Sequence, residues 1–287
     1  MFDSISGTTQ TFCLVAHPAE RSSSPALQNA SFEALSLDAR FMAYDVLPGS
    51  LGDAVAGMKA LGIRGYSVGV PHKSAIIAYL DELSDAARLM QSVNCVVENA
   101  DGRLVGYNTD GLGFTESLRN AGIELTGAHL AIIDDGAEGP SWIVQAALDG
   151  AKKILVLCPD DRMKKEEVWL SGLESALDIE FELRSLDAIP EDASFFEGYD
   201  ALCNGSRIGV GDTLGVLPVP AGVITRELTV VDANYNPRIT ALLACAEEAG
   251  CKTVEGLDPL LNQAAVAQRL WLGCELPKEQ VKLKLFG

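Results

Sequence analysis

The chain has 287 residues, of which 48% are hydrophobic and 22% charged, as in ordinary globular proteins with enough core for two modest domains. Its 40 acidic and 22 basic residues give a formal net charge of −18, which excludes the basic footprint of a nucleic-acid-binding protein and disfavours an anionic membrane surface. No apolar run is long enough to span a membrane, and the first ten residues lack the pattern of a signal peptide. A small anionic substrate needs a local positive pocket, because the overall field opposes it.

The cysteines and histidines indicate neither a disulfide framework nor a metal site. The seven cysteines are odd in number, no pair has C-x-x-C spacing, and most lie in apolar runs. We therefore expect buried free thiols in a reducing cytoplasm. The three histidines, at positions 17, 72 and 129, lack ligand spacing, so no metal is expected.

In the first part of the chain, short apolar runs alternate with helix-like stretches. We expect strands at 11–16, 41–47 and 66–71, helices at 25–35, 51–62, 73–83 and 85–91, and a β-hairpin at 94–108. The hairpin turn is expected at Asp101-Gly102, and Ser24 is placed to cap the first helix ahead of Pro25.

From Asp110 onward the alternation becomes regular. We expect helices at 111–122, 142–150, 239–250 and 260–273, a further helix after Cys158, and strands at 129–133, 152–158, 181–186, 199–205 and 227–234. Repeated strand–helix alternation indicates a parallel, doubly wound sheet, so the fold class is α/β. We expect an N-terminal α/β domain at 1–109, completed by 256–287, and a Rossmann-like dinucleotide-binding domain at 110–255.

The segment after the strand at 129–133 is the expected dinucleotide loop. A Rossmann fingerprint has the spacing G-x-G-x-x-G between a strand and a helix. Gly136 and Gly139 match its second and third glycines, whereas Asp134 replaces the first. Asp135 and Glu138 add two carboxylates, which oppose the attraction of a helix N-terminus for an anion, about 0.3–1 kcal/mol for an exposed charge. The alternative is an ordinary strand–turn–helix with a solvated acidic loop.

Several short motifs along the chain carry more information together than singly. They are Ser22-Ser23-Ser24-Pro25, Val68 to Lys73, Leu80 to Leu83, Ser92 to Cys95, Gly106 to Asp110, Asp232 with Tyr235 and Pro237, and Gln263-Ala264-Ala265. In this combination the chain resembles the shikimate dehydrogenase family over nearly its whole length.

The resemblance implies an enzyme that transfers a hydride reversibly between NAD(P) and a ring hydroxyl of shikimate, quinate or a close analogue. The first domain would bind this small anionic cyclohexane or cyclohexene carboxylate, and the second the nicotinamide cofactor. The implied substrate ligands are Ser22 and Ser24 for the carboxylate, Asn94, Asp110 and Gln263 for ring hydroxyls, and Tyr235 beside the substrate. The implied cofactor contacts are Gly136, Gly139, Asp160 and Gly256. Family members occur as monomers and dimers, so the oligomeric state stays open.

Lys73, paired with Asp110, is the implied catalytic acid/base. Oxidation of a secondary alcohol needs a group that takes the hydroxyl proton as hydride leaves. A lysine can do this if its pKa falls from about 10.4 toward neutrality in a desolvated cleft, whereas a neighbouring carboxylate opposes that fall. The two groups are therefore expected to titrate as a coupled unit.

Two departures from the family pattern bear on specificity. Gly69 stands where the family usually has Thr or Ser, so it either makes room for a bulkier, quinate-like substrate or is a glycine that strand packing requires. The family's N-R-T stretch, whose Arg favours NADP, is here Cys158-Pro159-Asp160, with Arg162 following shortly. Because an acidic residue at the place of Asp160 binds the ribose of NAD and repels the phosphate of NADP, we expect NAD to be preferred.

Three functions are compatible with these residues. The first is an NAD-preferring dehydrogenase of quinate, shikimate or a near relative. The second is a non-catalytic, sensor-like protein that keeps the substrate pocket, which the acidic loop favours and the intact Lys73 and Asp110 disfavour. The third is an oxidoreductase of the same fold that acts on an unrelated hydroxy acid.

Overall fold

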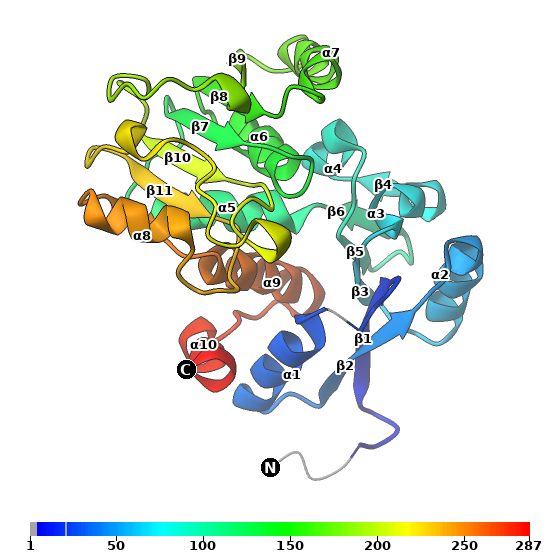
Figure 1. The fold of residues 1–287 in the computed structure, drawn as a ribbon. Coiled ribbons are helices and arrows are strands. Elements are labelled where there is room, and N and C mark those ends of the chain that lie inside the picture. Colours follow the sequence, from blue (N-terminus) through cyan, green and yellow to red (C-terminus); the bar gives the residue numbers. More distant parts are fainter. Residues whose placement is uncertain (1–4, 21) are drawn as a thin grey trace. The chain divides into compact units, whose positions relative to one another are not determined.

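The computed structural model describes residues 5–20 and 22–287 and divides the chain into two compact units. Unit 1 comprises Met1–Thr109 and Leu261–Gly287, and unit 2 comprises Asp110–Leu260 (Figure 1). The chain returns to unit 1 within helix α9 (Leu257–Leu272), slightly later than the expected return near Gly256. Of the helices in the described part of the chain, none is long and apolar enough to cross a membrane.

Unit 1 is built on a mixed six-stranded sheet with the order β2-β1-β3-β5-β6-β4. The strands are β1 (Gln10–Ala16), β2 (Ala39–Asp45), β3 (Gly65–Val68), β4 (Glu82–Leu83), β5 (Cys95–Glu98) and β6 (Leu104–Tyr107). Strands β1, β2 and β3 are parallel, whereas β5 runs antiparallel to both β3 and β6. The expected hairpin is confirmed, and its turn contains Gly102 at a φ of 74°, which glycine adopts without strain.

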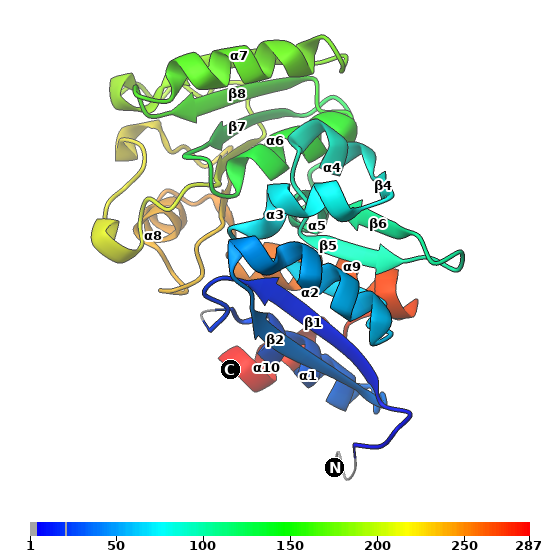
Figure 2. The ribbon, with the colours of Figure 1, turned by 90° about the vertical axis from the view of Figure 1, so that its right-hand side faces the viewer.

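The helices of unit 1 cover both faces of this sheet. They are α1 (Ser24–Ala34), α2 (Leu51–Ala60), α3 (His72–Ala75), α4 (Asp85–Met90), α9 from Leu261 onward and α10 (Lys278–Phe286), with 3-10 turns η1 (Pro48–Ser50) and η2 (Ile76–Tyr79). Figure 2 shows α2 on one face of β1 and β2, with α1 and α10 on the opposite face. Strand β1 supplies both cores, since Cys13 and Val15 pack into one cluster and Phe12, Leu14 and Ala16 into the other.

The helix expected at 73–83 is wrong in its second half. The chain leaves the helical conformation at Leu80, whose φ and ψ of −106° and 148° are extended. Asp81 then joins the sheet, because its N–H donates to the carbonyl of Leu104 and its carboxylate accepts from the Leu104 N–H. Glu82 and Leu83 form β4, which pairs with β6. The helical pattern of apolar residues was overridden by this edge of the sheet.

Unit 2 has six parallel strands in the order β12-β11-β10-β7-β8-β9. The strands are β7 (His129–Ile133), β8 (Lys153–Cys158), β9 (Glu180–Ser185), β10 (Ala201–Asn204), β11 (Thr229–Asp232) and β12 (Lys252–Val254). This order reverses direction between β7 and β10, as in the doubly wound dinucleotide-binding fold. The expected α/β class is thereby confirmed, and the reversal marks where ligands bind in such sheets.

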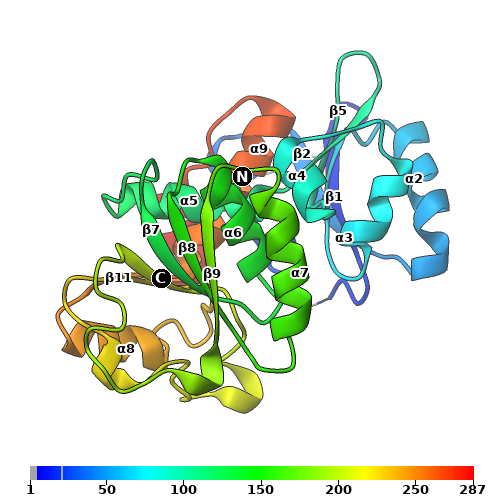
Figure 3. The same ribbon diagram turned by 90° about the horizontal axis from the view of Figure 1, so that it is seen from above.

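Helices lie on both faces of the unit 2 sheet. They are α5 (Thr109–Asn120), α6 (Gly139–Leu148), α7 (Met163–Glu174) and α8 (Ala241–Glu248), together with the first turn of α9 and 3-10 turns η3 (Leu186–Ala188), η4 (Gly211–Thr213) and η5 (Ala221–Val223). Helices α6 and α7, in the crossovers toward β9, lie on one face, and α8, in the crossover toward β12, lies on the other, as Figure 3 shows. Because both faces are covered, β7 and β8 are buried nearly end to end, which their continuous apolar runs predicted.

Candidate functional site

In unit 1, Asn94 and Gln263 are joined through one buried hydroxyl. The Asn94 side-chain amide donates to Thr109 Oγ1 at 3.0 Å, and its Oδ1 accepts from the Thr109 backbone N–H at 2.7 Å. Thr109 Oγ1 also lies 3.3 Å from Gln263 Oε1. Thr109 is fully buried and Asn94 nearly so, whereas Gln263 is half-buried. The structure therefore brings together two of the expected hydroxyl ligands and locks the rotamer of Asn94.

Ser22 and Ser24 also lie beside one another, at the start of α1. The Ser22 hydroxyl accepts from the Ser24 backbone N–H at 3.2 Å and donates to Ser24 Oγ at the same distance. Ser24 is the first residue of α1 rather than its cap, and the cap position is taken by Ser23, whose side chain makes no capping bond. Both hydroxyls are half-buried, so they form a small cluster of donors suited to a carboxylate.

Lys73 belongs to the short helix α3, which follows a turn through Val70 and Pro71. The turn is held by its neighbours, because the buried ring of His72 donates from Nε2 to the carbonyl of Val46 at 2.7 Å. The carbonyl of Lys73 accepts from the Val93 N–H at 2.8 Å. The backbone that carries the half-buried Lys73 side chain is thus tied on both sides.

Gly69 has a packing reason that does not involve the substrate. A Cβ at this position would lie 2.9 Å from the Cβ of Ala16 and 3.6 Å from Leu14 Cδ1, both on β1. The Gly69 N–H donates to the carbonyl of Val15 at 2.9 Å, which draws the two segments together. A side chain here would point into β1, so the geometry favours the packing explanation over room for quinate.

Asp110 begins the unit 2 segment in the first turn of α5. Helix α5 packs closely on α6, since a Cβ at Gly111 would lie 2.4 Å from the carbonyl oxygen of Ser141. One turn later Phe114 stacks on Trp142, with ring centroids 4.1 Å apart and planes 3° from parallel. This contact fixes the helix start that presents Asp110.

The loop after β7 has Asp134 buried beneath it. Asp134 is fully buried, and its Oδ1 accepts from the Gly136 N–H at 2.6 Å. A Cβ at Gly139 would lie 2.4 Å from the same oxygen, so the side chain fills the space beside the helix start. Burial raises the pKa of the Asp134 carboxyl to about 6, and the Gly136 N–H partly opposes this rise.

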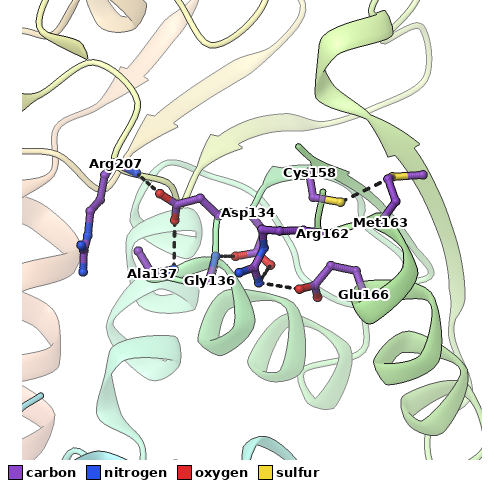
Figure 4. Close-up of polar contacts among 9 residues, drawn as sticks. Asp134, Gly136, Ala137, Cys158, Arg162, Met163, Glu166 and Arg207 are labelled. Atoms are coloured by element: carbon purple, nitrogen blue, oxygen red, sulfur yellow. Dashed lines mark hydrogen bonds and ion pairs between the residues drawn. The ribbon is translucent and has the colours of Figure 1, made fainter. Parts of the chain in front are cut away.

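A cation from the next crossover faces this buried carboxylate. Arg162, the residue before α7, has its guanidinium 2.5 Å from Glu166 Oε1 and 3.7 Å from Asp134 Oδ2 (Figure 4). Its Nη1 lies so close to Gly136 that a Cβ there would approach it to 2.7 Å. Glu166 is itself 3% exposed and Arg162 23%, so the guanidinium lies between two buried carboxylates. The Asp134 carboxylate is therefore buried beside a guanidinium that it shares with Glu166.

The second acidic residue of the loop behaves differently. The half-buried Asp135 accepts from the Ala137 N–H at 3.0 Å through Oδ1 and from the Arg207 N–H at 2.9 Å through Oδ2. Arg207 lies in the loop after β10, the strand next to β7. Loops from the two central strands thus converge on one carboxylate at the point where the strand order reverses.

The glycines of these two loops make close backbone contact. The N–H groups of Glu138 and Gly139 both donate to the carbonyl of Gly205, at 2.9 and 3.1 Å. A Cβ at Gly205 would lie 2.7 Å from the Gly139 nitrogen. Gly136 has a φ of 88°, a conformation that favours glycine. Gly136 and Gly139 are therefore needed for the loop geometry expected of a dinucleotide site.

Asp160 lies at the end of β8, as expected, but its carboxylate already has a protein partner. Ser185 Oγ, at the end of β9, donates to Asp160 Oδ1, and the Asp160 N–H donates to Asp187 Oδ2 at 3.3 Å. The carboxylate is exposed but is drawn toward the neighbouring strand.

Asp232 organises the loop that carries Tyr235. It is fully buried, and its two oxygens accept from Thr240 Oγ1 at 2.6 Å and from the side-chain amides of Asn204 and Asn234 at 3.1 and 3.0 Å. Burial raises the pKa of Asp232 to about 6, against these hydrogen bonds. Tyr235 itself is 37% exposed.

Gly256 is required by the same loop. A Cβ on it would lie 2.4 Å from the carbonyl oxygen of Asn234 and 2.6 Å from that of Ala233. The glycine thus lets the backbone before α9 approach the loop that follows β11.

Sequence reasoning assigned no structural role to four residues that shape the site. Thr109 lies within the quoted Gly106–Asp110 motif, which was its only signal. Arg162 was considered only in relation to the cofactor, and Glu166, one helical turn later, is the recognisable i,i+4 partner. Arg207 contributes through its backbone, and Figure 4 shows its side chain directed away from Asp134. Such a backbone contact has no signature in a single sequence.

Comparison with known proteins gives consistent matches. The family model described as the shikimate dehydrogenase substrate binding domain matches residues 14–96. A curated relative from Thermococcus kodakarensis, named shikimate dehydrogenase (NADP(+)), is 37% identical over 267 residues, which are 92% of each chain. The crystal structure of shikimate 5-dehydrogenase from Listeria monocytogenes in complex with shikimate and NAD is 35% identical, with a TM-score of 0.94 over 99% of each chain. The structure of 5-ketofructose reductase of a Gluconobacter strain is 31% identical, with a TM-score of 0.90 over 98% of this chain and 99% of its own.

These matches contradict the expected preference for NAD. The curated relatives, including those from Thermococcus, Listeria and Streptococcus, are named as NADP(+) enzymes. The expectation rested on the acidic residue Asp160, one oxygen of whose carboxylate accepts from Ser185 on the adjacent strand. The same matches are enzymes, so they lend no support to a sensor-like protein.

Proposed function

Since this chain belongs to the shikimate dehydrogenase family, we propose that it catalyses reversible oxidation of a ring hydroxyl of shikimate with NADP(+) as the hydride acceptor. The observation that carries the proposal is the 37% identity to a named shikimate dehydrogenase (NADP(+)) across 92% of both chains. The hydrogen-bonded group of Asn94, Thr109 and Gln263 in unit 1 supports it. Amide and hydroxyl groups held in one arrangement are suited to reading the positions of ring hydroxyls.

Each expected substrate ligand takes a defined role in this proposal. The hydroxyls of Ser22 and Ser24 bind the substrate carboxylate, which requires donors rather than acceptors. Asn94 and Gln263 bind ring hydroxyls, and Thr109 holds both amides in place and is a positioning residue. Asp110 accepts a hydrogen bond from a further ring hydroxyl, and Tyr235 lies against the substrate. All of these roles follow the family resemblance residue by residue.

Lys73 is the proposed acid/base. When the substrate alcohol is oxidised, the carbon loses a hydride and the hydroxyl proton moves to the Lys73 amine, so that the carbonyl forms without a free alkoxide. In the reverse direction the Lys73 ammonium returns that proton to the carbonyl oxygen. The turn held by His72 and Val93 keeps the lysine backbone in place during both steps.

The nicotinamide dinucleotide fits the loops of unit 2. It supplies the acceptor and donor of the hydride when bound. Gly136 and Gly139 provide the close backbone approach, and the N–H groups of Ala137 and Arg207 already hold an anionic group, the Asp135 carboxylate. Asp160 and Gly256 flank this region at the ends of β8 and before α9. A cradle that holds a carboxylate has the donors that a pyrophosphate requires.

A kinetic assay with a matched lysine variant tests the proposal. Purified protein is given shikimate with NADP(+), and nicotinamide reduction is followed against reactions without substrate. Lys73→Ala should lower kcat roughly 100- to 10,000-fold, the range of general acid–base catalysis, and leave the KM for shikimate within a few-fold. Lys59→Ala removes an exposed lysine of α2 in the same unit and should leave both constants unchanged. No saturable shikimate oxidation, or full turnover by Lys73→Ala, contradicts the proposal.

A second substrate is favoured by one comparison. The structural similarity to 5-ketofructose reductase, at 31% identity, makes a keto sugar the alternative substrate. Reduction of 5-ketofructose by NADPH is measured in parallel with shikimate oxidation, and the larger kcat/KM identifies the substrate class. Quinate is included in the same panel.

A further inference from the structure

The dinucleotide loop has two kinds of N–H donor. Those of Gly136, Glu138 and Gly139 donate to groups inside the protein, namely the buried Asp134 carboxylate and the carbonyl of Gly205. These bonds define the loop and its packing on the neighbouring loop. Breaking the bond from Gly136 would leave the fully buried Asp134 carboxylate without this donor, so we expect these bonds to persist when a ligand binds.

The donors that can change partner are those on Asp135. The N–H groups of Ala137 and Arg207 point to its two carboxylate oxygens, at 3.0 and 2.9 Å. They come from the loops after β7 and β10, between which the strand order reverses and where the phosphates of a nucleotide bind in such sheets. Asp135 is half-buried, so its side chain has solvent into which it can turn, unlike that of Asp134.

A second observation separates Asp135 from the rest of the acidic loop. Asp134 Oδ2 is buried and has no hydrogen-bond partner among the described residues, and the nearby charge is the Arg162 guanidinium at 3.7 Å. Arg162 in turn binds Glu166 at 2.5 Å. The Asp134 carboxylate therefore lies beside a side-chain cation, whereas the Asp135 carboxylate accepts from two backbone N–H groups.

We propose that the Asp135 carboxylate occupies the position of the cofactor pyrophosphate and must turn away when the dinucleotide binds. This inference rests on the proposed function. Asp135 is then an internal competitor that weakens cofactor binding and thereby favours its release. The carboxylate is a mimic of the ligand anion, because it uses the same two donors and the same sign of charge.

The competitor role and a purely structural role predict opposite changes in dinucleotide affinity when the Asp135 side chain is removed. If Asp135 only holds the loop together, its removal weakens dinucleotide binding as it lowers the melting temperature. If it competes, its removal frees two donors and removes a like charge, so binding tightens although the melting temperature falls. We expect Asp135→Ala to lower the Kd for NADPH about tenfold, equivalent to about 1.4 kcal/mol. Asp135→Asn keeps an acceptor oxygen without the charge and should give an intermediate gain.

The matched control is Asp192→Asn. Asp192 also accepts from a backbone N–H two residues ahead, that of Ser194 at 2.9 Å, and lies in the exposed connection between β9 and β10. The variant changes the net charge by the same amount and should leave the Kd unchanged. It thereby separates a local effect of Asp135 on the Kd from the effect of a changed net charge on the electrostatic field of the protein.

The experiment titrates wild-type protein and the three variants with NADPH, with NADH and with inorganic pyrophosphate by calorimetry, and records melting curves and the KM for shikimate. Tighter NADPH and pyrophosphate binding by Asp135→Ala, with an unchanged KM for shikimate, supports the inference. Equal or weaker binding by Asp135→Ala, when the wild type binds NADPH, overturns the inference and leaves the proposed function intact. Absence of dinucleotide binding in every variant overturns both.

Discussion

The buried carboxyl of Asp134 makes a prediction about stability that can be worked from the structure. Its pKa is raised from 3.8 to about 6, chiefly by burial. Between these two values the folded protein binds a proton that the unfolded chain does not, so this group's contribution to stability falls as the pH rises. With these pKa values, the free energy of unfolding should gain about 1.4 kcal/mol from Asp134 between about pH 8 and pH 5.

The substitution Asp134→Asn removes this contribution and keeps an oxygen for the Gly136 N–H. Urea unfolding of wild type and variant is measured at several values between about pH 5 and pH 8, and the difference between the two curves is taken. The pKa of Asp232 is raised in the same direction, but Asp232 is present in both proteins, so its contribution cancels in the difference between the two curves. Asp192→Asn is the control, because the Ser194 N–H lowers the pKa of Asp192 and keeps it ionised throughout this range. Parallel curves for wild type and Asp134→Asn would refute the reasoning.

Two glycines make further predictions about packing. Gly65→Ala should destabilise the protein by about 1–3 kcal/mol in urea unfolding, because its Cβ would lie 2.4 Å from Trp271 Cδ1, while Gly57→Ala, with open space around it, should not destabilise. Gly69→Ala should destabilise the protein for a similar reason and lower activity toward shikimate and quinate in equal proportion. A second substitution, Ala16→Gly, should partly restore both stability and activity. A selective loss of activity toward one substrate would show that Gly69 faces the substrate.

Much of the fold could be predicted from local patterns. The apolar runs that became β7 and β8 are buried on both faces, and continuous hydrophobicity is what such a position demands. The hairpin turn at Gly102 follows from the freedom of glycine at positive φ. The second half of the helix expected at 73–83 failed because Asp81 found backbone partners on β6, which local periodicity does not record.

The candidate site, too, could be predicted only in part from the sequence. The motifs identified Asn94 and Gln263, but the hydroxyl of Thr109 that joins them is a contact between residues far apart in the chain. The three carboxylates of the dinucleotide loop looked equivalent in the sequence. In the fold, Asp134 is buried against Arg162, and Asp135 binds two N–H groups. The NAD preference inferred from Asp160 was wrong, because the curated relatives are named as NADP(+) enzymes, and the sequence also did not show that Ser185 donates to this carboxylate.

By itself, the sequence determined the α/β class, the positions of the glycines and the residue types available for chemistry. Hydrophobic period, turn residues and motif spacing are local properties, and they are present in the unfolded chain. The tertiary structure decided what each polar side chain does, because burial and hydrogen-bond partners come from segments distant in sequence. An aspartate in the loop after β7 is therefore fully buried beside Arg162 at position 134, and at position 135 it is half-buried and joins the N–H groups of two loops.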